Sequence, residues 1–317
     1  MMSHLLGLED IDLFTIKQIL DQAKKFKEIF TRPIKQVPTL RGKTIAQLFY
    51  ESSTRTRASF DMAIKTLGAS SLNLNIAVSS VNKGETLIDT ARNLEAMGVD
   101  AIIIRHPMSG APYLLSKYLK IPIINAGDGQ HEHPTQALLD IYTMREICPN
   151  LRGKTVLIVG DIAHSRVARS NIWGLLKLGA KVIVVGPSVF IPKDIVNMGV
   201  SVSNDLDKVL PKADFINVLR IQLERKGSDI FPSQREYTNL FGITETRIKK
   251  AKKNVVVMHP GPINRGVEID SAVADGPYNV ILNQVNNGIT IRMAIIYLLL
   301  IRAVTKSATY TRSQSKK

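Results

Sequence analysis

The chain has 317 residues, of which 44% are hydrophobic and 22% charged, and its formal net charge is +15. The hydrophobic and charged fractions are close to globular averages, which argues against a disordered, collagenous or coiled-coil protein. The one cysteine, Cys148, cannot form an intramolecular disulfide, and a zinc ribbon is excluded for the same reason. The length favours two domains, and the charge favours anionic partners such as phosphates, carboxylates or nucleic acid.

We expect neither a secretory signal nor a membrane span. The first ten residues lack a basic segment followed by a long apolar run. The longest apolar run, residues 293–301, is far shorter than the roughly 20 residues that cross a bilayer. These features predict a cytoplasmic protein with no membrane partner.

The first half of the chain shows the alternation of strands and helices that is typical of βαβ units. Apolar residues at helical spacing predict an opening helix from Leu13 to Phe30, with Asp10 or Asp12 as its N-cap. Short β-rich runs separated by helical patterns follow, and such units form a parallel sheet. The predicted strands cover residues 44–50, 72–76, 101–105 and 121–125.

The second half repeats this alternation. The sequence Leu-Arg-Gly-Lys-Thr at 40–44 recurs at 151–155, each time directly before a predicted strand. A helix over 134–147 ends the first half, and a final helix over 289–304 is hydrophobic nearly all round, which predicts burial. The strands of the second half are predicted at 155–159, 181–185, 200–202, 214–218 and 254–258.

The most informative segment is 49–57, where a strand end is followed by Ser and Thr hydroxyls and by Arg55 and Arg57 at the start of a helix. A helix N-terminus presents unpaired N–H groups and the positive end of its dipole, so this combination is typical of a phosphate site. The P-loop pattern of nucleoside-triphosphate enzymes is absent. The alternative is a Ser/Thr helix cap with surface arginines.

Two further strand ends carry side chains of matching chemistry. Arg105 and His106 follow the apolar run 101–104 of one predicted strand, and residues 127–133 follow another strand. Because open parallel sheets bind ligands at the carboxyl ends of their strands, these groups are expected at one edge with the segment 49–57. His131, Glu132 and His133 form too weak a pattern for a metal site, so we expect no metal and no cofactor.

These residues together resemble the aspartate/ornithine carbamoyltransferase family. The phosphate signature Ser-Thr-Arg-Thr-Arg stands at 53–57 and His-Pro-Thr-Gln stands at 133–136, each at a predicted helix start, and the resemblance covers essentially the whole chain. It implies two doubly wound parallel-sheet α/β domains joined by interdomain helices. The implied limits are 1–147 for carbamoyl phosphate binding, 148–288 for aspartate binding, and 289–317 for a helix that packs back on the first domain and a basic tail.

The acceptor is inferred from four segments of the chain. Residues 79–87, with Lys83, resemble the lysine loop of the aspartate branch, in which the lysine enters a neighbouring subunit's site; an ordinary glycine-containing loop is the alternative. Ornithine enzymes carry His-Cys-x-Pro near the C-terminus, where this chain has His-Pro-Gly-Pro at 259–262. The two carboxylates of aspartate require cations, and Arg166 and Arg220 follow predicted strands. A capped helix start with an exposed Arg166 and a solvated Arg220 are the alternatives.

The resemblance also implies roles for individual residues in attack of the aspartate amine on carbamoyl phosphate. The expected catalytic residues are Arg55, Thr56, Lys83, Arg105 and His133. Of these, Thr56, Arg105 and His133 would bind the carbonyl oxygen. No protein general base is assigned, because the departing phosphate can accept the proton. The residues expected to bind carbamoyl phosphate are Ser53, Thr54, Arg55, Thr56, Arg105, His133, Gln136, Gly261 and Pro262, and those expected to bind L-aspartate are Lys83, Arg166, Arg220 and Gln222.

The expected assembly is a homotrimer whose active sites are shared between subunits, and regulatory or dihydroorotase subunits are possible partners. The pathway implied is pyrimidine biosynthesis. A carbamoyltransferase for ornithine or another amine is the nearest alternative. Nucleic-acid binding is not expected despite the net charge of +15, because no basic stripe with interleaved aromatic residues is present.

Overall fold

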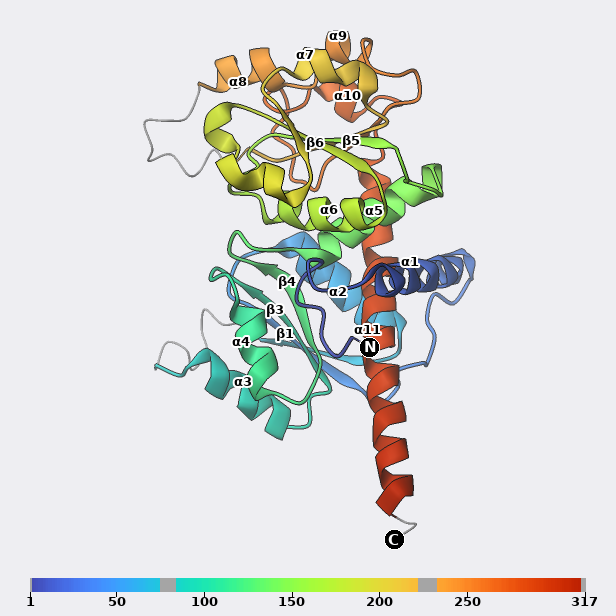
Figure 1. The fold of residues 1–317 in the computed structure, drawn as a ribbon. Coiled ribbons are helices and arrows are strands. Elements are labelled where there is room, and N and C mark those ends of the chain that lie inside the picture. Colours follow the sequence, from blue (N-terminus) through green and yellow to red (C-terminus); the bar gives the residue numbers. More distant parts are fainter. Residues whose placement is uncertain (1, 75–83, 222–232, 315–317) are drawn as a thin grey trace. The chain divides into compact units, whose positions relative to one another are not determined.

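The computed structural model describes residues 2–74, 84–221 and 233–314, which divide into two compact units (Figure 1). Unit 1 contains Met1–Thr135 and Asn287–Lys317, and unit 2 contains Gln136–Asn286. Each unit has its own parallel sheet, which confirms the predicted fold class. Helices α5 (Pro134–Ile147) and α11 (Ile281–Gln314) each contain residues of both units. The domain limits given above stay a prediction.

The sheet of unit 1 has four parallel strands in the order β2-β1-β3-β4. Phe49 at the end of β1 lies opposite Arg105 at the end of β3, and His106 lies opposite Asp128 at the end of β4. The carboxyl ends of these three neighbouring strands therefore share one edge. The strands are β1 (Thr44–Phe49), β2 (Ser70–Leu74), β3 (Ala101–His106) and β4 (Ile123–Asp128), close to the predicted ranges.

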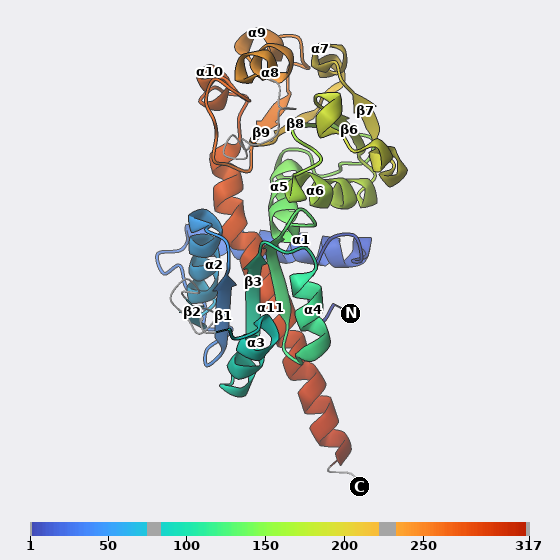
Figure 2. The same ribbon diagram turned by 90° about the vertical axis from the view of Figure 1, so that its left-hand side faces the viewer.

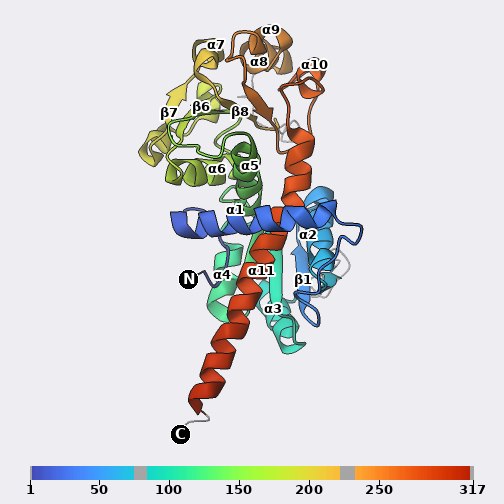
Figure 3. The same cartoon turned by 90° about the vertical axis from the view of Figure 1, so that its right-hand side faces the viewer.

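One face of this sheet is covered by α3 (Leu87–Ala96) and α4 (Ala111–Tyr118). Leu94 of α3 and Leu115 of α4 pack in one apolar cluster with Leu48 and Ile104 of the sheet. The helices α1 (Leu13–Lys27), α2 (Thr54–Thr66) and the unit 1 part of α11 lie on the other side, where α1 crosses α11 (Figure 3). Asp12 is the N-cap of α1 and accepts a hydrogen bond from the Thr15 amide at 2.7 Å, as one of the two predicted caps.

Helix α11 begins eight residues before the predicted start at 289. The residues 283–288, Asn-Gln-Val-Asn-Asn-Gly, lie outside the predicted helix and are mostly polar. In the structure Gln284 and Asn287 are buried, and Lys27 donates to the Asn287 side chain at 3.1 Å, so these polar residues belong to the interior face of a helix. By length and composition Ile281–Ile301 could also cross a membrane, but 67% of that window is buried inside the protein, as in a core helix.

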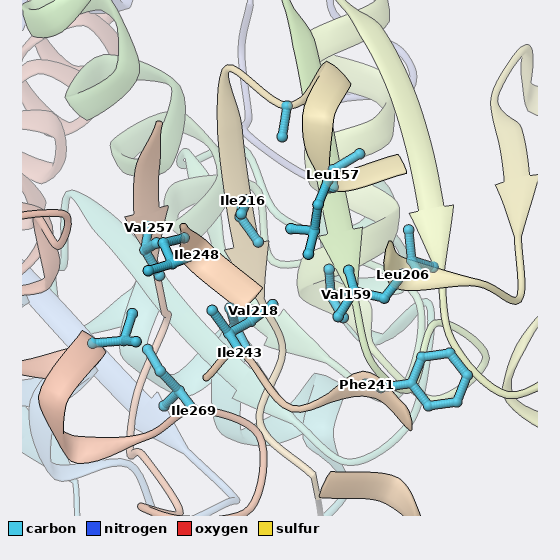
Figure 4. Close-up of a cluster of buried hydrophobic side chains, with 14 of the residues drawn as sticks. Leu157, Val159, Leu206, Ile216, Val218, Phe241, Ile243, Ile248, Val257 and Ile269 are labelled. Carbon is cyan, nitrogen blue, oxygen red and sulfur yellow. The ribbon is translucent and has the colours of Figure 1, made fainter. Parts of the chain in front are cut away.

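The sheet of unit 2 has five parallel strands in the order β7-β6-β5-β8-β9. Leu157 of β5, Ile216 of β8 and Val257 of β9 pack against Ile243 and Ile269 from the connecting segments (Figure 4). These strands are apolar because helices cover the sheet. The strands are β5 (Thr155–Val159), β6 (Lys181–Val185), β7 (Ser201–Ser203), β8 (Phe215–Val218) and β9 (Val256–Met258), and the predicted limits of β5 and β6 are confirmed.

Helices lie on both sides of the unit 2 sheet. Helix α6 is on the opposite side of β5 and β6 from α7, α8 and α9 (Figure 2). The residues before α6, α7, α8 and α9 are polar, and each accepts a hydrogen bond from a first-turn amide, which favours the start of the helix at that point. The helices are α6 (Arg166–Lys177), α7 (Leu206–Val209), α8 (Gln234–Phe241), α9 (Glu245–Ile248) and α10 (Ser271–Ala274).

Candidate functional site

The segment that follows β1 forms the start of α2. Ser53 is the N-cap residue, yet its side chain makes no capping hydrogen bond to the helix. Thr54 and Arg55 are exposed, Ser53 is half-buried and Thr56 is buried. The helix N-terminus therefore carries hydroxyl and guanidinium groups next to main-chain N–H groups, and this arrangement suits an anion.

Arg105 links the three strand ends of unit 1. Its Nε lies 3.2 Å from the Glu51 carboxylate after β1, and its Nη1 donates to the Ala126 carbonyl of β4 at 3.3 Å. Only 15% of its side chain is exposed. A guanidinium held by neighbouring strands in this way keeps its position without help from a ligand.

His133 lies at the end of the loop from β4 to α5 and is 4% exposed. Its Nδ1 is 3.5 Å from the Thr135 hydroxyl. The residue before it, Glu132, is fully buried, and its carboxylate accepts hydrogen bonds from the amides of Leu8 at 2.7 Å and Glu9 at 3.1 Å. The N-terminal segment is thus attached to the loop that carries His133.

Glu132 also belongs to a group of possible metal ligands. Ligand atoms of Glu9, His131 and Glu132 lie within 4.8 Å of one another. Both Glu132 oxygens already accept main-chain N–H groups, and the His131 Nδ1 lies 3.1 Å from Asp128. These contacts account for the buried carboxylate without an ion, and the expectation of no metal stays a prediction.

Unit 2 places two arginines at neighbouring strand ends. Arg166 begins α6 after β5, and Arg220 follows β8, which pairs with β5. Both are half-buried. Ser165 accepts from the Ala168 amide at 3.1 Å, so the predicted helix cap is present as well. Gly160, with φ +136°, allows the close approach of these strand ends, because a Cβ there would lie 2.9 Å from the Leu219 Cβ.

The segment after β9, the next strand in the sheet, contains His-Pro-Gly-Pro. His259 is buried, its Nε2 lies 3.2 Å from Glu268, and its Nδ1 accepts from the Gly261 amide at 2.8 Å. Since Nδ1 accepts, the proton is on Nε2 and points to the carboxylate. Gly261 has φ +65° and Pro262 is exposed. A buried histidine therefore holds the main chain at Gly261, the residue directly before Pro262.

Gln136 lies in the first turns of α5 and donates its Nε2 hydrogen to Asp140, one helical turn later, at 3.0 Å. Asp140 is fully buried. Burial raises the pKa of Asp140 to about 6, and hydrogen bonds from Asn171, Gln284, Gln136 and Asn217 oppose that rise. The side chain that we predicted to orient substrate is thus held by a carboxylate.

The structure groups the predicted residues by unit. Ser53, Thr54, Arg55, Thr56, Arg105 and His133 belong to unit 1, and Gln136, Arg166, Arg220, Gly261 and Pro262 belong to unit 2. Lys83 and Gln222 lie outside the described residues. Their assigned roles stay predictions.

Sequence reasoning missed the acidic residues that hold these groups: Glu51, Asp140 and Glu268. Asp140 had a detectable signal, because Gln136 and Asp140 have the i, i+4 spacing that brings side chains together on a helix. Glu51 and Glu268 had none, since their contacts with Arg105 and His259 depend on the packing of separate segments.

Comparison with known proteins agrees with this arrangement. The family profile described as aspartate/ornithine carbamoyltransferase, carbamoyl-P binding domain, matches residues 3–146. The profile for the Asp/Orn binding domain of the same family matches residues 152–299. The chain belongs to the aspartate/ornithine carbamoyltransferase family, which is a family of transferases.

Individual members of the family are similar to this chain in sequence and in structure. The chain is 57% identical to the aspartate carbamoyltransferase catalytic subunits of Halothermothrix orenii and Syntrophobacter fumaroxidans, over 93% of its length and 94% and 97% of theirs. Trypanosoma cruzi aspartate transcarbamoylase matches with a TM-score of 0.85 and 31% identity, and Pyrococcus furiosus ornithine carbamoyltransferase with 0.84 and 32%. Each match covers 94% of this chain and 96% of the other. The fold is therefore common to both acceptor types.

Proposed function

We propose that this protein transfers the carbamoyl group of carbamoyl phosphate to the α-amino group of L-aspartate, giving N-carbamoyl-L-aspartate and phosphate. The observation that carries the choice of acceptor is the placement of Arg166 and Arg220 at neighbouring strand ends of unit 2. Two guanidinium groups match a dicarboxylate. Relatives that are 57% identical and named aspartate carbamoyltransferase support the same acceptor.

In this proposal unit 1 binds the phosphate. Ser53, Thr54, Arg55 and Thr56 bind its oxygens at the start of α2, where the helix dipole adds to the positive charge. The attacking amine is neutral, and the carbonyl oxygen gains negative charge as the new C–N bond forms. Thr56, Arg105 and His133 stabilise that oxygen, and one such donor contributes about 2.7 to 4 kcal/mol.

The remaining contribution is alignment. Gln136 and the main-chain carbonyls of Gly261 and Pro262 orient the carbamoyl NH2 or the amine, and Arg166 and Arg220 hold the aspartate carboxylates. Alignment of two bound reactants supplies about 7 to 11 kcal/mol. The departing phosphate accepts the proton that the amine loses, so the reaction needs no protein base.

The direct test is to incubate the purified protein with carbamoyl phosphate and either L-aspartate or L-ornithine. The proposal predicts N-carbamoyl-aspartate from the first mixture and no citrulline from the second. Citrulline as the product would contradict the assignment of Arg166 and Arg220 while leaving the phosphate assignment intact.

We further propose a cytoplasmic homotrimer in which Lys83 completes the phosphate site of a neighbouring subunit and Gln222 assists Arg220, in pyrimidine biosynthesis. Regulatory or dihydroorotase subunits are possible additional partners. Lys83→Ala and Arg105→Ala chains are each expected to be inactive alone and to regain part of the activity when they are mixed and reassembled. Mixed assemblies that stay inactive would exclude shared sites.

A further inference from the structure

Asp140 is surrounded by four side-chain amides from separate elements of unit 2. Gln136 of α5 and Gln284 of α11 donate to its Oδ1 at 3.0 and 2.7 Å. Asn171 of α6 and Asn217 of β8 donate to its Oδ2 at 2.9 and 3.3 Å. All five side chains are buried. None of the four donors carries a charge.

This arrangement determines the direction of each amide. An ionised carboxylate only accepts hydrogen bonds and has about four lone-pair positions. With a pKa of about 6, Asp140 is ionised at pH 8. Each of the four amides must therefore turn its NH2 group towards Asp140 and its carbonyl oxygen away from it.

Two neighbouring main-chain groups require the same directions independently. The Gln284 Oε1 accepts from the His259 amide at 2.9 Å, and a main-chain N–H can only donate. The Asn171 Nδ2 also donates to the Val167 carbonyl at 3.1 Å, and a carbonyl can only accept. The assignment of these amide orientations therefore does not depend on Asp140 alone.

The orientation of Gln136 has a chemical consequence. One hydrogen of its NH2 group is used by Asp140, and its carbonyl oxygen, which is turned away from Asp140, is the acceptor that it can offer to a ligand. A carbamoyl NH2 is a hydrogen-bond donor and needs an acceptor. A reversed Gln136 would oppose that NH2 with a second donor.

The contact with Gln284 extends to the segment after β9. Asp140 holds Gln284, Gln284 holds the His259 amide, and the His259 ring accepts from the Gly261 amide. Gly261 and Pro262 are the residues whose carbonyl oxygens would accept from the same carbamoyl group. One carboxylate is thus connected to both predicted sets of acceptors.

We propose that Asp140 is a positioning residue, which fixes Gln136 and, through Gln284 and His259, Gly261 and Pro262, so that acceptor oxygens face the NH2 group of carbamoyl phosphate. The inference rests on the proposed function. It assigns to Asp140 the recognition of the carbamoyl NH2 and no part in binding the phosphate, because no phosphate-binding residue of unit 1 is among its partners.

The test compares two ligands and three variants. Acetyl phosphate has a methyl group in place of the NH2, so it probes the phosphate and carbonyl-oxygen contacts without the NH2 contacts. Asp140→Leu removes the carboxylate. Gln284→Met and Asn171→Leu are matched, since each replaces one buried amide donor of Asp140 by an apolar side chain of similar shape, but only Gln284 contacts His259. Calorimetry gives the Kd of each ligand.

Asp140→Leu and Gln284→Met should weaken carbamoyl phosphate binding about tenfold, the scale of a lost hydrogen bond, and change the Kd of acetyl phosphate less than about twofold. Asn171→Leu should change neither Kd by more than about twofold. Equal losses for both ligands, or equal effects of Gln284→Met and Asn171→Leu, would overturn the inference. If Asp140→Leu does not fold, the matched pair decides.

The acceptor assay separates this inference from the proposed function. If the variants show the predicted changes in Kd but the wild-type protein does not carbamoylate aspartate, Asp140 remains a positioning residue and the proposed acceptor is wrong. If the wild-type protein carbamoylates aspartate but the variants lose equal affinity for carbamoyl phosphate and acetyl phosphate, the proposed function holds and the role of Asp140 is wrong.

Discussion

The edge of unit 1 that is proposed to bind phosphate and the surroundings of Asp140 in unit 2 are built in opposite ways. In unit 1, the groups expected to bind phosphate follow one another along the chain from Ser53 to Thr56, are partly exposed and include a guanidinium. In unit 2, a single buried carboxylate is held by neutral amides from four elements, and Gln284 is 144 residues from Asp140.

The difference separates two tasks. Phosphate carries charge, so exposed cations and a helix N-terminus attract it over a distance and bind it strongly. A carbamoyl NH2 is neutral and small, so its recognition depends on whether a donor or an acceptor faces it. A buried network with fixed amide orientations is suited to that distinction.

The largest expected effect concerns the unit 1 edge. Arg105→Ala should lower kcat/KM for carbamoyl transfer by about 10² to 10³-fold, because it removes a donor to the developing oxyanion. Steady-state kinetics with both substrates measures this. Lys43→Ala is the matched control: it removes a cation paired with Asp100 at 2.8 Å, at the amino ends of the same strands β1 and β3. If kcat/KM of Arg105→Ala is no lower than that of Lys43→Ala, the carboxyl-end edge of unit 1 does not have the role proposed for it.

The second prediction concerns the energetics of Asp140. Its pKa is raised from 3.8 to about 6 in the folded protein, so the folded state holds the proton more tightly than the unfolded chain. Wild-type stability therefore falls as the pH rises from about 4 to about 6, by about 3 kcal/mol for a rise of about two pKa units. Asp140→Asn has no such ionisation.

The free energy of unfolding of Asp140→Asn minus that of the wild type should consequently be about 3 kcal/mol larger at pH 7 than at pH 4. Urea unfolding of both proteins at matched concentration gives the difference, in which the other titrating groups cancel. Parallel pH profiles of the two proteins would show that the carboxylate is not buried as a charge.

The third prediction concerns a contact between distant segments of unit 1 that contributes to protein stability. A Cβ added to Gly7 would lie 2.3 Å from the Glu132 Oε1, next to a carboxylate held by two main-chain amides. Gly7→Ala should destabilise the protein by about 1 to 3 kcal/mol through overpacking. Thermal unfolding measures this.

Glu132→Asp provides the control for that contact, because the shorter side chain makes room for the new methyl group. The double variant should be destabilised by less than the sum of the two single variants. Additive effects would mean that Gly7 and Glu132 do not interact, and that this contact between distant segments does not contribute to the stability of unit 1.

The smallest effect is expected at Arg265, which forms a bidentate ion pair with Asp275 at 2.6 and 2.7 Å close to the segment after β9. Both side chains are largely exposed, and such pairs contribute little. Arg265→Ala should change kcat/KM and the Kd of carbamoyl phosphate by less than about twofold. A larger change would mean that surface charge, rather than the buried network, controls this segment.

The same contrast explains what could be predicted from sequence. Strand limits such as 155–159 follow from local periodicity, and the helix start at Thr54 is indicated by the Ser and Thr residues that precede an apolar helical pattern, so both were predictable. The early start of α11 was not, because the polarity of Gln284 and Asn287 indicates a loop until their buried partners are known. The i, i+4 spacing of Gln136 and Asp140 is a local signal, but the contacts of Asp140 with α6, β8 and α11 appear in no local pattern.

The central claim is that unit 1 residues bind the phosphate of carbamoyl phosphate and that the unit 2 arginines bind the carboxylates of aspartate. The most direct measurement is calorimetric titration of the double variant Arg166→Ala/Arg220→Ala with carbamoyl phosphate, together with an aspartate assay. We expect a Kd within about threefold of the wild type and a loss of turnover with aspartate of at least about 10²-fold. Loss of carbamoyl phosphate binding in this variant would contradict the division between the two units.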